Sequence, residues 1–277
     1  MSFWDSYEFW RDAVLVALIS AAALSYLGVW VALKKVVYVP LALSQVSAVG
    51  VVLAFLLGDW IGATEQLHSE KGPIDPAWFS LLLAVAVSLY FARPRSDGGK
   101  PVVVAYLLSG AAVLLLGGFL RQDVHDVDSI LFGSAVLVET VQILYVGAGA
   151  MVILALHALL YRRFLFVSFD PTTAGASGIP VYGTEVLLYG SFALMISLAT
   201  RAFGALPAFG LCVLPALTGL RLGRSMRIAF IISMAVGLAS AGLGYYLSFA
   251  FELSAGASMV GLAGLLYLVS LAVQRRS

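Results

Sequence analysis

Residues 13–33 read AVLVALISAAALSYLGVWVAL, a stretch of uncharged and mostly apolar side chains. A helix needs about 20 such residues to cross the hydrocarbon core of a bilayer, and backbone polar groups in lipid are satisfied only within a helix or a closed barrel. The stretch therefore predicts a membrane-spanning helix. Residues 1–12 before it carry three acidic side chains and one arginine. Because that is the wrong polarity for the basic start of a cleaved signal peptide, we expect the helix to remain as an anchor.

Similar runs follow along the whole chain, of which 61% is hydrophobic and only 11% is charged. Ordinary soluble domains are about a quarter charged, so these runs do not belong to a soluble core. Apolar runs lie at 13–33, 41–58, 77–92, 101–120, 135–161, 181–200, 205–220, 227–250 and 257–273. They predict an all-α, polytopic transmembrane helical bundle of eight or nine spans, with residues 1–277 forming one domain. Pro207 and Pro215 leave a broken or partly re-entrant helix open for the run 205–220.

The charged residues alternate between the connections. Every second connection is basic, and these connections contain Lys34 and Lys35, then Arg93, Arg95 and Lys100, then Arg162 and Arg163, then Arg221, Arg224 and Arg227, and finally Arg275 and Arg276. The connections between them carry most of the acidic residues. Since cytoplasmic loops of membrane proteins are enriched in lysine and arginine, we expect the N-terminus outside and the C-terminus inside.

Several classes of protein would need residues that this chain lacks. A net charge of +1 gives no basic surface for nucleic acid. The single cysteine, Cys212, excludes an intramolecular disulfide and a cysteine-based metal cluster. The sequence contains no G-x-x-x-x-G-K-[ST] loop for nucleotide phosphates, and neither H-E-x-x-H nor G-x-S-x-G for an intramembrane enzyme. We therefore expect no catalytic residues and no covalently bound cofactor.

The connection 162–180, RRFLFVSFDPTTAGASGIP, contains the signals for a short cytoplasmic helix. Asp170 is a favourable N-cap residue, and Pro171 suits the first helical position because proline has no N–H to leave unsatisfied. Gly178 suits a position just beyond the helix end. These three residues predict a short helix within about 168–180.

Six short segments carry a recognisable pattern. They are Leu27–Lys35 (LGVWVALKK), Leu41–Gly50 (LALSQVSAVG), Ile130–Ser134 (ILFGS), Ser168–Pro180 (SFDPTTAGASGIP), Arg201–Gly219 (RAFGALPAFGLCVLPALTG) and Leu253–Gly264 (LSAGASMVGLAG). Together, and in this order, they resemble the permeases of zinc and manganese ABC importers. The resemblance implies a homodimeric permease in the bacterial inner membrane, a cytoplasmic ATPase that binds ATP, and an extracytoplasmic substrate-binding protein. It also implies that the short helix couples to the ATPase through Ser168, Asp170, Pro171, Thr173, Gly175 and Gly178.

The chain departs from the family's pattern in the second run. The family has an Asp and a His there, one helical turn apart, where they can bind a divalent cation, but this chain has Leu41 and Gln45. Leucine supplies no ligand and glutamine only one weak oxygen, so a tight Zn or Mn site is not available at this pair. We expect the translocation pathway to be lined by Ser44, Gln45, Ser47, Pro207 and Pro215. The alternative is that these polar side chains bridge helices.

A second candidate metal site lies in the connection before residue 135. His125, Asp126 and Asp128 offer an imidazole and two carboxylates, which suit Zn or Mn, and the alternative is a solvated acidic loop. We expect His157 and Glu185 to lie near membrane interfaces, because each falls close to an end of its run. The substrate implied by the resemblance is a divalent metal ion, but Leu41 and Gln45 leave open another ion, a chelate, or a membrane scaffold without transport.

Glycines are frequent in the last third of the chain, among them Gly237, Gly244, Gly261 and Gly264. Because glycine lets helix backbones approach closely in lipid, these positions predict close helix contacts. Whether the contacts lie within one subunit or between two is left open.

Overall fold

The computed structural model describes residues 7–61, 76–93, 99–119 and 140–274, and within these ranges it contains helices and no strand. The helices are α1 (Tyr7–Leu33), α2 (Tyr38–Ile61), α4 (Pro76–Phe91), α5 (Lys100–Gly117), α7 (Thr140–Phe169), α8 (Pro171–Ala176), α9 (Val181–Phe203), α10 (Ala205–Leu222), α11 (Met226–Phe251) and α12 (Ala255–Gln274). Each of the nine predicted apolar runs overlaps one long helix. The predicted all-α transmembrane bundle is confirmed.

Among the described helices, eight are long and apolar enough to cross a bilayer. The remaining apolar helix, α4, has 16 residues. At about 1.5 Å per residue it rises about 24 Å, which is less than the hydrocarbon core of about 30 Å. The predicted number of eight or nine spans is therefore confirmed, but the helix that separates the two numbers is the short α4 rather than the run 205–220.

The fifth run ends later than its hydropathy indicates. The sequence predicts a span that stops near residue 161, but α7 continues to Phe169. Phe164 and Val167 lie in this extension and are buried, so packing against the rest of the bundle continues the helix beyond the apolar run. Arg162 and Arg163 are exposed on the surface of α7 rather than in a loop.

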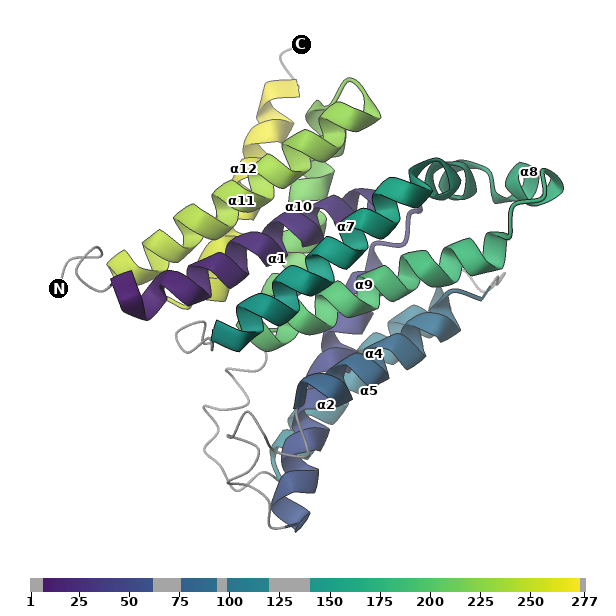
Figure 1. The fold of residues 1–277 in the computed structure, drawn as a ribbon. Coiled ribbons are helices and arrows are strands. Elements are labelled where there is room, and N and C mark those ends of the chain that lie inside the picture. Colours follow the sequence, from purple (N-terminus) through teal and green to yellow (C-terminus); the bar gives the residue numbers. More distant parts are fainter. Residues whose placement is uncertain (1–6, 62–75, 94–98, 120–139, 275–277) are drawn as a thin grey trace.

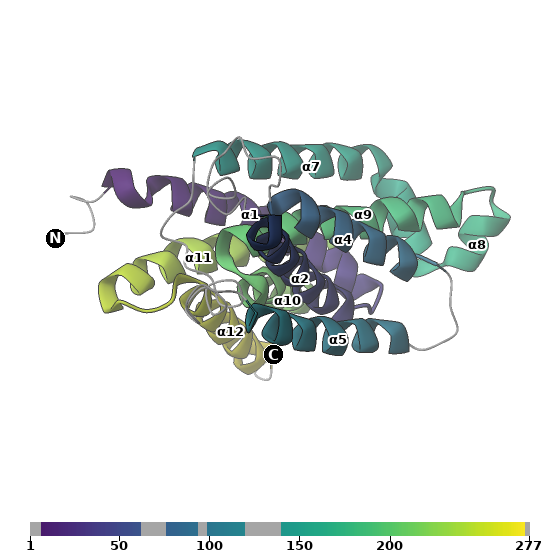
Figure 2. The ribbon, with the colours of Figure 1, turned by 90° about the horizontal axis from the view of Figure 1, so that it is seen from below.

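The long helices form three neighbouring groups (Figure 1). The helices α1, α7 and α9 lie side by side in the middle, α10 to α12 pack on one side of them, and α2, α4 and α5 pack on the other. In the view of Figure 2, α7 runs along one face of the molecule and α5 and α12 along the opposite face. The three outer helices expose most of their apolar side chains, as expected of surfaces that face lipid.

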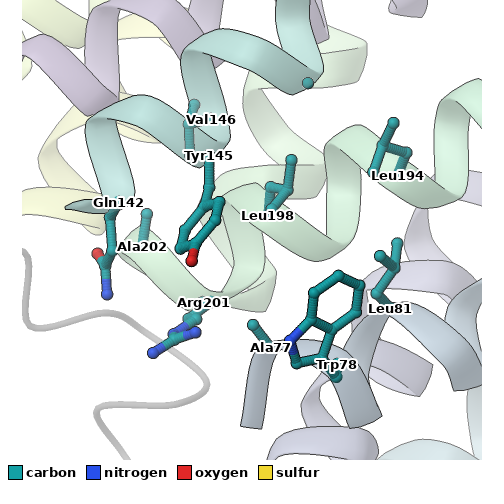
Figure 3. Close-up of a pocket in the computed structure, with 11 residues that line it drawn as sticks. Ala77, Trp78, Leu81, Gln142, Tyr145, Val146, Leu194, Leu198, Arg201 and Ala202 are labelled. Carbon is teal, nitrogen blue, oxygen red and sulfur yellow. The ribbon is translucent and has the colours of Figure 1, made fainter. Parts of the chain in front are cut away.

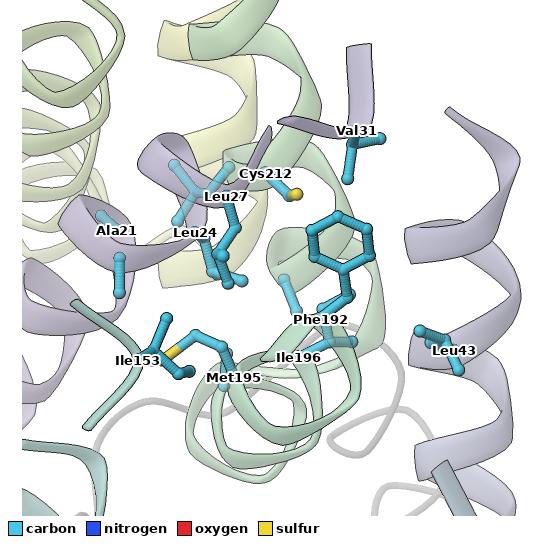
Figure 4. Packing of buried hydrophobic residues seen from close by; sticks show 14 of the residues in the cluster. Ala21, Leu24, Leu27, Val31, Leu43, Ile153, Phe192, Met195, Ile196 and Cys212 are labelled. Carbon is cyan, nitrogen blue, oxygen red and sulfur yellow. The ribbon is translucent and has the colours of Figure 1, made fainter. Parts of the chain in front are cut away.

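The largest buried cluster joins α1, α9 and α10 (Figure 4). Leu24 and Leu27 of α1 meet Phe192 and Ile196 of α9, with Cys212 of α10 beside them. The backbones of α1 and α10 approach closely at Gly28, where a Cβ atom would collide with the carbonyl oxygen of Cys212. Glycine is therefore required at this crossing, because any side chain would push the two helices apart.

Pro215 lies inside α10, yet the helix is continuous from Ala205 to Leu222. The broken or re-entrant helix left open by the sequence is therefore not present. Proline has no N–H to bond the carbonyl four residues earlier, and the Ser25 Oγ of α1 donates to that carbonyl, of Leu211, at 3.2 Å. The Ser233 Oγ of α11 in turn donates to the Ser25 carbonyl oxygen at 2.7 Å. Neighbouring helices thus satisfy the backbone group that the proline frees. We call these contacts of Ser25, Leu211 and Ser233, together with Gly28, the α1–α10–α11 seam.

The glycines of the last third divide into two kinds. At Gly237 an added Cβ would lie 3.0 Å from the Ala21 carbonyl oxygen of α1, and at Gly244 it would lie 2.6 Å from the Met259 Cα of α12. These two glycines therefore pack helices within the chain. At Gly261 and Gly264 a Cβ would meet no atom within 4 Å, so neither glycine brings two described helices of this chain together.

Candidate coupling helix and translocation pathway

The short helix α8 has the caps that its sequence predicts. The Asp170 carboxylate accepts a hydrogen bond from the Thr173 backbone N–H at 3.0 Å, and Pro171 occupies the first turn. Contacts with the Thr173 side chain and with the backbone of Thr173 and Thr172 hold the pKa of Asp170 below its ordinary value. The carboxylate is therefore ionised at neutral pH, next to the positive end of the short helix.

The other end of α8 closes just as tightly. The Ser177 Oγ donates to the Thr173 carbonyl at 2.8 Å, and the Ile179 N–H donates to the Ala174 carbonyl at 3.1 Å. Gly178 follows with a φ of +81°, a left-handed conformation that favours glycine. The result is a compact turn of helix with a defined shape.

Most of α8 is available to a partner. Asp170, Pro171, Thr173, Gly175 and Gly178 are exposed. Ala174 is fully buried and fixes the helix against α7 and α9, with which α8 makes contacts. Figure 1 shows α8 projecting at one end of the molecule, beyond the ends of α7 and α9.

Ser168, the remaining predicted coupling residue, differs from the others. It lies in the last turn of α7 and is partly buried. Its hydroxyl oxygen is buried and has no hydrogen-bond partner in the described part of the protein. Ser168 is therefore part of α7, with its hydroxyl turned into the protein, rather than an exposed residue of α8.

The predicted pathway residues of α2 point into the protein. Ser44 and Ser47 are fully buried. The Ser44 Oγ donates to the Leu41 carbonyl at 2.9 Å, within its own helix. The Ser47 Oγ and the Gln45 Oε1 are buried and have no partner in the described residues. Other buried polar atoms of the bundle share this lack of a partner in the described residues, among them the Ser20 Oγ of α1 and the Ser240 Oγ of α11.

The predicted pathway residues of α10 lie in a neighbouring helix. Pro207 and Pro215 are both buried in α10, and α2 packs against α10. Beyond the polar stretch, Val49 and Val52 of α2 form an apolar cluster with Val113 of α5 and Ala205 of α10. The structure thus brings the two predicted pathway segments side by side, with an apolar cluster in contact with both.

His157, expected from the sequence near a membrane interface, is enclosed within the helix bundle. It is fully buried, and its Nε2 lies 3.1 Å from the Ser191 Oγ. Since that hydroxyl donates to the Leu187 carbonyl at 2.8 Å, it accepts from the imidazole, which places the proton on Nε2. The ring packs against Trp30 and Phe164, with centroids 5.9 and 4.6 Å away. The ring is therefore enclosed by aromatic side chains of α1 and α7, a contact that the sequence did not indicate.

Glu185 is also not simply in contact with water. Its Oε1 lies 2.7 Å from the Lys34 Nζ, and the two side chains are only 17% and 9% exposed. The pair joins the end of α1 to the start of α9. Sequence reasoning missed it because the partners are 151 positions apart, and neither lies in a motif that would indicate the other.

The third predicted site lies outside the described residues, because His125, Asp126 and Asp128 belong to the segment 120–139. Within the described ranges, no group of three His, Cys, Asp or Glu side chains is arranged to hold a metal ion. A groove of about 170 Å³ does lie between α4, α7 and α9 (Figure 3). Trp78, Leu81, Tyr145 and Leu198 line it, with Arg201 at one end, so its walls suit an apolar chain rather than an ion.

Eight of the described helices are long and apolar enough to cross a bilayer, which defines a multi-pass membrane protein. Residues 6–274 match the family described as the ABC 3 transport family, and the chain belongs to that family. The resemblance to the permeases of metal-ion ABC importers is thereby confirmed, and so is the location in the bacterial inner membrane. Subunits of this class are components of transporters rather than catalysts.

Individual relatives match over almost their full length. The chain is 25% identical over 273 residues to the uncharacterized membrane protein slr2045 of Synechocystis, covering 97% of this chain and 92% of the relative. It is 24% identical over 267 residues to the manganese import system permease protein ScaB of Streptococcus gordonii, covering 95% and 91%. A chain of the solved structure "PsaBC from Streptococcus pneumoniae in complex with Fab" superposes with a TM-score of 0.81 at 21% identity, covering 97% and 94%, which shows a shared fold.

Proposed function

We propose that this chain is the membrane permease subunit of an ATP-driven importer for divalent metal ions of the manganese or zinc type. It works as a dimer with a separate cytoplasmic ATPase and an extracytoplasmic binding protein. The observation that carries the proposal is the match to the ABC 3 transport family over residues 6–274. The name of ScaB, a manganese import permease, supports the cargo.

The short helix α8 supports the coupling to an ATPase. It is rigidly capped at both ends and presents five exposed candidate residues, while Ala174 anchors it to the bundle. Exposed basic residues lie near the helix ends next to α8. Lys35 follows the end of α1, and Arg162 and Arg163 lie near the end of α7 that precedes α8. By the positive-inside rule this end is cytoplasmic, which supports an N-terminus outside and a C-terminus inside.

The coupling assignment is tested by substitutions on α8 that spare the fold. A Cβ at Gly175 would meet the Val181 Cγ2 at 3.5 Å, an ordinary contact, so Gly175→Ala should fold normally. Asp170→Asn keeps a favourable N-cap and removes the charge. Both variants should retain wild-type thermal stability and lose ATP-dependent ion uptake in proteoliposomes that contain the ATPase and the binding protein. Wild-type coupling in both would contradict the assignment of α8.

A second candidate function keeps the fold and changes the cargo. It is favoured by Leu41 and Gln45, which replace the Asp and His of the family's pattern. At these two positions only the neutral amide oxygen of Gln45 could bind a cation. Such a site suits a weakly held ion or a chelate better than a bare Zn²⁺ bound tightly.

One uptake experiment separates these alternatives. Proteoliposomes of the assembled transporter are loaded with ATP and supplied with radioactive Mn²⁺, Zn²⁺ or Fe²⁺, each alone and in competition. The main proposal expects ATP-dependent accumulation of Mn²⁺ or Zn²⁺. An assembled complex that hydrolyses ATP without accumulating either ion would favour another cargo, and failure to bind any ATPase would favour a scaffold.

A further inference from the structure

The ion pair of Lys34 and Glu185 lies close to α8, at the start of the membrane-spanning helix α9 that follows it. The Lys34 Nζ and the Glu185 Oε1 are 2.7 Å apart, and the two side chains are 9% and 17% exposed. Glu185 lies in the second turn of α9, which begins at Val181 directly after α8 and its cap. Lys34 follows the last residue of α1.

Between α8 and Glu185 the chain is tightly bonded. The Ile179 N–H donates to the Ala174 carbonyl, and the Thr184 Oγ1 donates to the Pro180 carbonyl at 2.9 Å. The Thr184 N–H bonds the same carbonyl at 3.0 Å. Because these hydrogen bonds fix the connection between α8 and α9, we expect a displacement of α8 to move the first turns of α9, where Glu185 lies.

On the other side of the pair, Lys34 opens the turn between α1 and α2. The Val36 N–H closes this turn on the Val31 carbonyl at 3.0 Å, and Lys35 takes a left-handed φ of +58°. The next helix, α2, begins at Tyr38 and reaches Gln45 two turns later. Gln45 is the residue whose buried amide oxygen has no partner in the described residues. The pair therefore connects the start of α9 to the helix that carries the candidate pathway.

We propose that Lys34 and Glu185 are positioning residues that transmit movement of α8 to the α1–α2 turn and hence to the pathway segment of α2. The proposal rests on the proposed function of α8 as the ATPase contact. A charged pair suits this role, because separating opposite charges in a poorly solvated site is costly, so the two helix ends move together. Bulk stability is a weaker explanation, since uncharged replacements of a buried pair are often tolerated.

The test compares charge removal with charge reversal in the reconstituted transporter, which contains the permease, its ATPase and the binding protein. Four permeases are measured: wild type, Lys34→Met/Glu185→Gln, Lys34→Glu/Glu185→Lys, and the control Lys35→Met, which removes the same charge from the exposed neighbouring position. The readouts are the number of ATP molecules hydrolysed per Mn²⁺ ion imported and the melting temperature of the complex.

The uncharged pair should melt close to wild type, bind the ATPase and hydrolyse ATP, but use at least about fivefold more ATP per ion, the low end of coupling factors between sites. The reversed pair should restore the ratio to within about twofold of wild type, and Lys35→Met should leave it unchanged. A wild-type ratio in the uncharged pair would overturn the proposal. So would a lowered melting temperature of the uncharged pair that the reversed pair corrects without any change in the ratio, because the pair would then only hold the bundle together.

Failure of the proposed function gives a different result. If α8 does not contact the ATPase, Gly175→Ala will hydrolyse the same number of ATP molecules per imported ion as the wild-type permease. If α8 contacts the ATPase but the pair transmits nothing, Gly175→Ala will be uncoupled while the uncharged pair is not. The two failures are therefore distinguishable within one set of measurements.

Discussion

The α1–α10–α11 seam and the polar stretch of α2 both bury serine side chains among apolar helices, but they satisfy them differently. In the seam, the Ser25 Oγ bonds the Leu211 carbonyl that Pro215 leaves free, and the Ser233 Oγ bonds the Ser25 carbonyl. In α2, the Ser47 Oγ and the Gln45 Oε1 have no partner in the described residues. The hydrogen bonds of the seam tie three helices together, whereas the two atoms of α2 make no such bond within the described residues, which fits the proposed pathway.

The largest loss of stability is expected at Gly28, where the backbones of α1 and α10 are in direct contact. In Gly28→Ala, the new Cβ would collide with the Cys212 carbonyl, and we expect a loss of about 3 kcal/mol or more, the upper part of the usual cost of overpacking. The measurement is the melting temperature and the yield of monodisperse protein in detergent. The matched control is Gly261→Ala, where a Cβ meets nothing within 4 Å. A Gly28→Ala protein as stable as this control would show that α1 and α10 can separate freely.

The next largest loss of stability is expected when the Glu185 carboxylate loses its ion-pair partner, Lys34. Lys34→Met leaves the Glu185 carboxylate without the ammonium group 2.7 Å away. Breaking a buried pair in this way costs 3–5 kcal/mol when burial is complete, and we expect about 2–4 kcal/mol at this slightly exposed site. Denaturant or thermal unfolding measures it, with Lys35→Met as the control. If adding Glu185→Gln to Lys34→Met does not recover stability, the charge left behind is not the cause.

A pair of serine substitutions tests the comparison most directly. Ser25→Ala removes the donor to the Leu211 carbonyl and leaves that buried acceptor unsatisfied, which should cost about 1–3 kcal/mol. Ser47→Ala removes a buried hydroxyl without a partner in the described residues, so its stability should stay within about 0.5 kcal/mol of wild type. Melting temperatures of the two variants under one set of conditions decide the matter. Equal destabilisation by both would remove the distinction between the two regions.

The smallest effect on stability, and a large one on transport, is expected at Gln45. Gln45→Met keeps a similar volume and removes the buried amide oxygen that has no partner in the described residues, so the protein should be at least as stable as wild type. If the amide assists passage of the cargo, uptake should fall about tenfold, which corresponds to about 1.4 kcal/mol in the rate-limiting barrier. Uptake and melting temperature are measured on the same preparation. A variant with unchanged uptake would assign Gln45 to helix packing instead.

The sequence predicted the helices and the short α8 well because these features depend on neighbouring residues. A run of apolar residues is a helix in lipid wherever it packs, since its backbone has no other partner. The cap at Asp170 and the left-handed Gly178 are equally local. Errors arose where a contact beyond the run mattered, as in α7, which packing at Phe164 and Val167 extends past the predicted end.

The candidate site was predicted less completely. The residues of α8 and α2 could be named from the sequence. It did not indicate that the Ser168 hydroxyl is buried in α7, that the Gln45 Oε1 has no partner in the described residues, or that His157 is enclosed by Trp30 and Phe164. Lys34 and Glu185 could be read only as separate charges, one in a basic connection and one near a membrane interface. Their pairing depends on where the ends of α1 and α9 meet.

The sequence by itself thus determined which segments span the membrane, how basic connections alternate along the chain, and where the exposed helix is capped. Only the tertiary structure decided which faces of those helices meet, and with them the Lys34–Glu185 pair, the His157–Ser191 contact and the Ser25–Leu211 bond. The physical reason is the solvent. Lipid tails are as apolar as leucine, so hydrophobicity does not mark the inward face of a membrane helix, and the partners of its few polar groups emerge only when the helices are packed.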